Sequence, residues 1–89
     1  MLERWDVVNR VLPDEGFAEA ALAFAKEFAA GPQLAYRYMK ENLNRAMTGE
    51  LTDCLDLEVT HHIHCGQTED HREATKAFVA KREPVFRGR

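Results

Sequence analysis

Residues that stop helices recur at nearly regular intervals along this chain and divide it into segments of helical length. The breaks are Gly31-Pro32, Thr48-Gly49, Gly66 and Pro84. Between the breaks, apolar residues return every three or four positions, which is the period of one face of an α-helix. The spacing predicts helices over about 14–30, 32–47, 50–65 and 69–83, joined by short loops that favour helical hairpins.

Each of the first three predicted helices carries an apolar stripe. The stripes consist of Phe17, Ala21, Phe24 and Phe28; of Leu34, Ala35, Tyr38, Met39, Leu43, Ala46 and Met47; and of Leu51, Cys54, Leu55, Val59, His62 and Ile63. His62 lies within the third stripe, so we expect its ring to pack against a neighbouring element. Tyr36 and Tyr38 are two residues apart, so the two rings cannot both face one core.

The ends of the first helix have specific expected conformations. Asp14 or Glu15 is expected to open it. Gly31 is expected to take the left-handed position that often ends a helix. Pro32 is expected to preset the first turn of the next helix, because its ring fixes φ near the helical value.

The last twenty-two residues, Thr68–Arg89, contain a clearly delimited helix followed by a tail. Thr68 is a favourable N-cap, because its hydroxyl accepts a hydrogen bond from an amide of the first turn. Glu69 and Asp70 follow in that turn, where the helix dipole favours negative charge. Pro84 ends the helix, and Val85 and Phe86 then give an apolar tail.

The N-terminal residues predict a strand without a partner. Trp5–Leu12 carries valines and a leucine before the breaker Pro13, which is typical of a short strand. A lone strand is not stable by itself, and the rest of the chain offers no comparable run. The alternative is an extended arm that frays.

Length and charge restrict the classes of function. A chain of 89 residues forms one domain at most, and 45% apolar with 30% charged residues is a globular profile. Twelve basic against fifteen acidic residues give no case for nucleic-acid binding, and no apolar run is long enough for a membrane span. Two cysteines, Cys54 and Cys65, make no disulfide framework, so a reducing, cytoplasmic setting is expected.

Two groups of side chains on the third predicted helix could carry chemistry, but both have simpler interpretations. His61, His64 and Cys65 lie three and four residues apart and could share a metal ion, but no compact pair supplies a fourth ligand. We therefore expect a histidine-rich helix face or interface, and no metal. The carboxylates of the same helix are expected to be solvated rather than catalytic. They are Glu50, Asp53, Asp56 and Glu58.

Several motifs together resemble the C-terminal end of the crotonase superfamily, the enoyl-CoA hydratases and isomerases. TEDHRE, the following AF and the terminal KREPVFRGR carry the resemblance most specifically. Upstream, VVNRVLPDE is similar to a strand and turn of the family, although Asp6 stands where the pattern usually has glycine. The helix–Gly-Pro–helix stretch and LDLEVTHH extend the similarity over nearly the whole chain.

The resemblance implies a fold and an incomplete enzyme. Residues 1–13 would be the last strand of a spiral domain, and residues 14–89 the mainly α C-terminal helical, trimerisation region. The family binds its thioester enolate with an oxyanion hole and moves protons with carboxylates. These groups lie in the family's spiral domain, so we expect no catalytic residue in this chain, and we expect the chain to be a C-terminal fragment or a truncated product.

The resemblance also implies a binding role for two residues, Phe78 and Lys81. They match a phenylalanine near the family's acyl pocket and a lysine near the adenine and phosphates of coenzyme A, often on a neighbouring subunit. The thioester would be a substrate, and no other cofactor is implied. The simpler alternative is that Phe78 belongs to the core and that Lys81 is a surface lysine.

Two functions follow as alternatives. The first is oligomerisation, as a trimer or a dimer of trimers, together with completion of an acyl-CoA site in a hydratase or isomerase. The second is a stand-alone helical interaction module without catalytic activity, which requires the helices to close into a bundle. The two differ in how much apolar surface stays exposed.

Overall fold

The computed structural model describes the whole chain, Met1–Arg89, and contains four α-helices and no β-strand. The helices are α1 (Phe17–Ala29), α2 (Gln33–Ala46), α3 (Leu51–Gly66) and α4 (Glu69–Val79). The predicted mainly α fold with four helices is therefore confirmed. The largest difference in bounds is at the end of α4, which stops at Val79, before Pro84 is reached.

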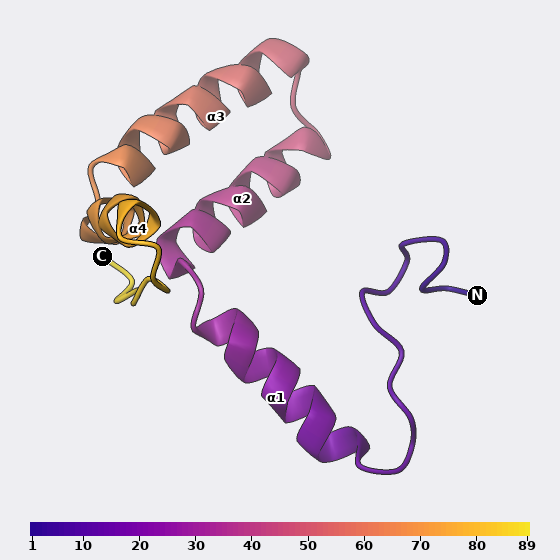
Figure 1. Cartoon of the computed structure of the whole chain (residues 1–89). Coiled ribbons are helices and arrows are strands. Elements are labelled where there is room, and N and C mark those ends of the chain that lie inside the picture. The colour runs from indigo at the N-terminus through magenta and orange to yellow at the C-terminus, as the bar shows by residue number, and fades with distance from the viewer.

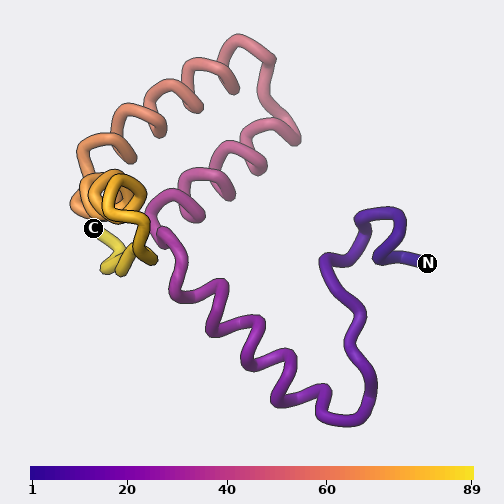
Figure 2. Tube along the Cα trace, in the orientation of Figure 1, coloured from indigo at the N-terminus to yellow at the C-terminus, as the bar shows by residue number.

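The helices form a hairpin with two elements attached to one end of it (Figure 1). α2 and α3 lie side by side and antiparallel, as the short loop between them predicts. α4 runs across the end of this hairpin, and α1 points away from it (Figures 1 and 2). The N-terminal segment turns back beside α1 and does not reach the hairpin.

The predicted N-terminal strand was wrong: residues 2–9 form turns and bends, and residues 10–13 have no regular secondary structure. The Val7 amide donates to the Leu2 carbonyl at 3.0 Å, and the Arg10 guanidinium lies 4.6 Å from the centre of the Phe24 ring. The physical reason is that no other strand of this chain offers a ladder of amides and carbonyls. Asp6 has φ 57°, which lies in the left-handed region. Glycine occupies this region easily, so the glycine that the family usually has at this position would suit the same backbone conformation.

The junction of α1 and α2 also corrects two expectations. α1 opens at Gly16, with φ 73°, and not at Asp14 or Glu15. Gly31 is not left-handed, and the helix ends instead in right-handed geometry at Ala30, ahead of Pro32, which cannot continue it. Glycine is needed at position 31 because a Cβ there would overlap the Tyr36 ring.

The α2–α3 interface is built around His61, which is buried, and not around His62, which is exposed. His61 Nδ1 lies 2.6 Å from Asn42 Oδ1, and its Nε2 lies 3.2 Å from Glu41 Oε2. Its ring stacks on Tyr38 with the ring centres 4.3 Å apart. The prediction for His62 was wrong because the polar partners on α2, Asn42 and Glu41, lie opposite His61, which is about 100° around the helix from His62.

The two tyrosines of α2 point to different neighbours, as their spacing predicts. Tyr36 stacks on Phe28 of α1, with ring centres 4.8 Å apart, whereas Tyr38 stacks on His61 of α3. Tyr36 therefore joins α1 to α2, and Tyr38 joins α2 to α3.

Most of the apolar stripes remain uncovered. Only three residues, Ala77, His61 and Asp70, are buried. The radius of gyration is 16.5 Å, against about 12 Å for a compact domain of this length. The accessible surface is 7773 Å², against about 5,300 Å² for a folded monomer of this mass. The helices therefore form an open arrangement and not a closed bundle. No helix combines the length and the apolar character that crossing a bilayer requires.

The two glycines at 31 and 66 give a matched test of this packing. Gly31→Ala should lower the free energy of unfolding by about 1–3 kcal/mol, because Tyr36 must leave its position on Phe28. Gly66→Ala should raise it by about 0.5–1 kcal/mol, because Gly66 is helical and its Cβ would meet no atom. Thermal unfolding by circular dichroism measures both, and equal effects would contradict the assigned role of Tyr36.

Candidate functional site

α4 begins at the N-cap that the sequence predicts. The Thr68 hydroxyl accepts a hydrogen bond from the His71 amide at 3.1 Å and donates one to the Cys65 carbonyl at 2.7 Å. One hydroxyl therefore caps α4 and binds the end of α3. Glu69 and Asp70 occupy the first turn, as expected from the helix dipole.

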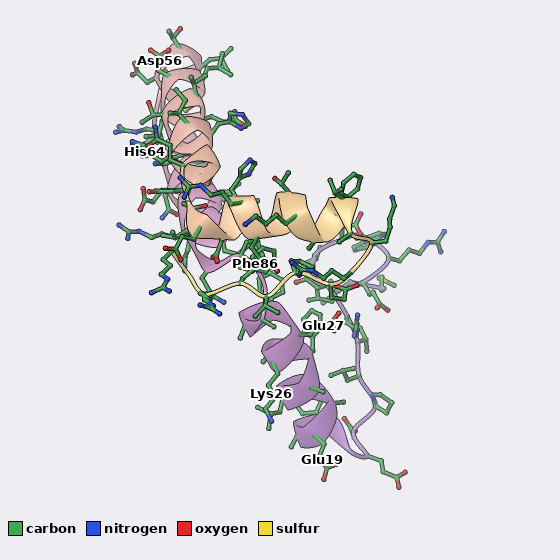
Figure 3. All side chains as sticks on the ribbon, turned by 60° about the vertical axis from the view of Figure 1, so that its left-hand side comes forward. Glu19, Lys26, Glu27, Asp56, His64 and Phe86 are labelled. Atoms are coloured by element: carbon green, nitrogen blue, oxygen red, sulfur yellow. The ribbon has the colours of Figure 1, made fainter.

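Asp70 has a second role that the sequence analysis missed. Its side chain is buried, and its two carboxylate oxygens accept the amides of Arg87 and Gly88 at 2.7 and 2.8 Å. Its own amide donates to the Arg89 carbonyl at 2.9 Å. Gly88 has φ 74°, so successive amides can converge on one carboxylate. These bonds hold the C-terminal tail alongside α4, as Figure 3 shows.

Glu73, one turn further along α4, holds the start of the same tail. Its carboxylate accepts two hydrogen bonds from the Arg82 guanidinium, at 2.6 and 3.1 Å, and one from the Val85 amide at 3.1 Å. These bonds, first those from Arg82, lower the pKa of Glu73 from 4.5 to about 2. The same pairing raises the pKa of the Arg82 guanidinium above its usual value.

The tail also places Phe86 against the hairpin. Phe86 is half-buried and lines a small apolar cavity of about 150 Å³ with Leu34, Ala35 and Ala74. Figure 3 shows Phe86 on the tail beside α4, near the start of α2. Apolar packing and the two carboxylates together fix the path of the chain after α4.

α4 ends in a Schellman turn with a lysine at the position that usually holds glycine. The Lys81 amide donates to the Phe78 carbonyl at 3.2 Å, and the Arg82 amide donates to the Ala77 carbonyl at 3.0 Å. Lys81 has φ 55°, a left-handed conformation that costs a residue with a side chain about 1–2 kcal/mol. Residues with such a strained backbone, held in place by their surroundings, are concentrated at functional sites.

The side chains of Phe78 and Lys81 lie together on the surface. Phe78 is 74% exposed, so it does not belong to the core of this structure. The Lys81 ammonium lies 5.0 Å from the centre of the Phe78 ring, within the range of a cation–π contact. This end of α4 therefore presents an apolar ring and a cation side by side, which suits a ligand with an apolar part and an anionic part.

The other sequence candidates are not brought together into a site. His61 faces α2, whereas His64 is exposed, and no three His, Cys, Asp or Glu side chains are arranged to hold a metal ion. The carboxylates of α3 are exposed. Two of them, Asp53 and Asp56, line a shallow surface hollow with Arg45 and Thr60.

The match to known proteins covers almost every residue of the chain. The model of the enoyl-CoA hydratase/isomerase family matches residues 2–89. The chain belongs to this family. The resemblance to the crotonase superfamily is thereby confirmed.

Individual relatives agree with this assignment. The 1,2-epoxyphenylacetyl-CoA isomerase of Escherichia coli is 35% identical over 96% of this chain. A crystal structure of an enoyl-CoA hydratase/isomerase family protein from Mycobacterium abscessus superposes on 99% of the chain with a TM-score of 0.87 and 35% identity. A structure of enoyl-CoA hydratase subunit I from Geobacillus kaustophilus gives a TM-score of 0.83, 32% identity and the same 99% coverage.

The similarity covers only part of each relative. This chain spans 32% of the Escherichia coli isomerase and 34% of each of the two solved chains. The open arrangement of α1, the hairpin and α4 therefore occurs within a larger structure in these family members.

The depressed pKa of Glu73 predicts how the tail responds to acid. Glu73→Gln removes the carboxylate, so the wild-type chain should melt higher than this variant at every pH above 4.5. The difference should shrink as the pH falls from 4.5 and vanish near 2, because the wild-type carboxylate then takes up a proton. Melting curves across this window measure it. Glu27→Gln, an exposed carboxylate of α1, is the control, and a pH-independent difference for Glu73→Gln would contradict the assignment.

Proposed function

We propose that this chain is the C-terminal oligomerisation region of an enoyl-CoA hydratase or isomerase and completes its acyl-CoA site with the end of α4. The observation that carries the proposal is the exposed pair at the end of α4, where Lys81 is held left-handed beside Phe78. The coenzyme A thioester is the substrate in this proposal. Hydration or isomerisation is assigned to other parts of the enzyme, and no residue of this chain is assigned a catalytic role.

The side chains of Phe78 and Lys81 are chemically suited to a coenzyme A thioester. The Lys81 ammonium can pair with a phosphate of coenzyme A, and the Phe78 ring can line an acyl chain. The Schellman turn fixes the backbone of both residues through the Phe78 and Ala77 carbonyls. Ala77 is 1% exposed, so the turn is anchored in the best-buried part of the chain.

The uncovered apolar surface supports the oligomerisation role. α2, α3 and the loop between them expose large apolar residues that recur four positions apart. They are Met39, Leu43, Met47, Leu51, Leu55 and Val59. The accessible surface exceeds that of a compact monomer by roughly 2,500 Å², an area on the scale of obligate interfaces.

The stand-alone interaction module remains the second candidate, and the open arrangement counts against it. That function needs helices that bury their stripes on one another, whereas α1 points away from the hairpin. Both cysteines are free, which fits the cytoplasmic setting that we propose for the enzyme.

Lys81→Gly separates the binding role from the structural one. Glycine adopts the left-handed conformation freely, so the variant should unfold with a free energy about 1 kcal/mol higher than the wild type. It should bind coenzyme A about tenfold more weakly, because the ammonium is lost. Calorimetric titration with coenzyme A and thermal unfolding measure the two effects.

Lys40→Gly on exposed α2 is the matched control. It should lower stability by about 1 kcal/mol, as glycine does inside a helix, and should leave coenzyme A binding unchanged. If Lys81→Gly binds coenzyme A as tightly as the wild type does, the assignment of Lys81 is wrong.

The oligomerisation role predicts self-association through the hairpin. Light scattering after size exclusion should give a mass three or six times the 10.2 kDa of one chain. Leu43→Glu places a charge on the apolar face and should reduce the mass to that of one chain. Its neighbour Asn44→Glu, on the polar side of α2, should leave the assembly intact. A monomeric wild type at high concentration would overturn the role.

A further inference from the structure

The tail and α4 enclose a groove on the side of the helix away from Phe78. Its volume is about 580 Å³, and only one of its lining residues, Val85, is hydrophobic. The other lining residues are Glu69, Asp70, Arg72, Glu73, Lys76 and Arg87. Lys76 and Phe78 are two residues apart on α4, which places them on nearly opposite faces of the helix.

All three carboxylates of the groove are engaged by the protein itself. Asp70 accepts two tail amides, and Glu73 accepts the Arg82 guanidinium together with the Val85 amide. Glu69 Oε2 accepts a hydrogen bond from Arg89 Nε at 2.8 Å. Both cations that neutralise these carboxylates, Arg82 and Arg89, lie outside the groove lining.

The three cations of the groove, in contrast, have no partner within hydrogen-bond or salt-bridge distance, although Lys76 acts at longer range on the Glu73 carboxylate. The side chains of Arg72, Lys76 and Arg87 form no salt bridge and no hydrogen bond. Arg72 and Lys76 are four residues apart, so their like charges lie on neighbouring turns of one helix face and repel each other. The Arg87 side chain is free because only its backbone binds Asp70.

Basic residues are concentrated at the C-terminal end of the chain. Six of the twelve basic residues lie in Thr68–Arg89, against four of the fifteen acidic ones. This end is therefore positive, although the chain as a whole carries a formal charge of −3. An anion in the groove would meet three donor groups that form no hydrogen bond within the protein, in a segment with two more basic than acidic residues.

We propose that the groove between α4 and the tail binds a phosphate-bearing anion of the diphosphate class through Arg72, Lys76 and Arg87. Two guanidinium groups from opposite walls bind phosphate oxygens in a bidentate manner, and the ammonium adds a point charge. A diphosphate engages more of the three cations at once than a single phosphate does. The proposal is independent of the Phe78–Lys81 pair, which lies on the other face of α4.

The test is a titration of the 89-residue chain with inorganic pyrophosphate, followed by heteronuclear NMR and calorimetry at low and at raised salt. The expected shifts fall on the amides of Arg72, Lys76 and Arg87, and inorganic phosphate should bind about tenfold more weakly. The Arg72→Gln/Arg87→Gln double variant should lose at least about tenfold in affinity for pyrophosphate. It should melt like the wild type, because neither side chain forms a hydrogen bond or a salt bridge.

Two single variants control for general attraction. Lys40→Gln and Lys26→Gln should bind pyrophosphate as the wild type does, since neither residue lines the groove. Equal pyrophosphate affinity in the double variant and the wild type would overturn the proposal. So would a hexaglutamate peptide that binds more tightly than pyrophosphate, because the groove would then select an acidic peptide rather than a diphosphate.

Discussion

The placement of Asp70 and Glu73, one turn apart on α4, determines much of what this chain presents at its C-terminal end. The Asp70 carboxylate accepts hydrogen bonds from the amides of residues 87 and 88, and the Glu73 carboxylate accepts them from the Arg82 guanidinium and the Val85 amide. The tail therefore runs back along its own helix, the Schellman turn is locked in place, and Phe86 is held against α2. A buried carboxylate without such partners would be strongly unfavourable, so helix and tail stabilise each other.

The helices were predictable because their signals are local. The caps, the breaks and the three-to-four spacing reside in adjacent residues, and Thr68 acts as the predicted cap. The predicted strand depended on partners outside the chain and did not form. The roles of His61 and Asp70 depended on contacts nineteen and seventeen residues away, with Asn42 and Arg87, which no periodicity encodes. Phe78 and Lys81 were found through the family resemblance, and only the structure showed that Lys81 is left-handed.

The open arrangement has a simple physical origin. α1 stacks on the hairpin through Phe28 and Tyr36, and α2 meets α3 mainly through a stacked, hydrogen-bonded histidine. These contacts set directions between helices but bury little apolar area, so most of the stripes still face solvent. Family membership gives this arrangement a context, because a solved relative superposes on it with a TM-score of 0.87, and this chain spans only 34% of that relative.

The way Asp70 binds the tail has an evolutionary consequence. Asp70 binds the backbone amides of the tail, so this contact does not restrict which side chain stands at position 87. Position 88 favours glycine, because its φ is 74°. Substitution at 87 can therefore change the charge of the surface beside α4 without disturbing the path of the tail. Descendants of a common ancestor could acquire or discard an arginine here while keeping the same fold.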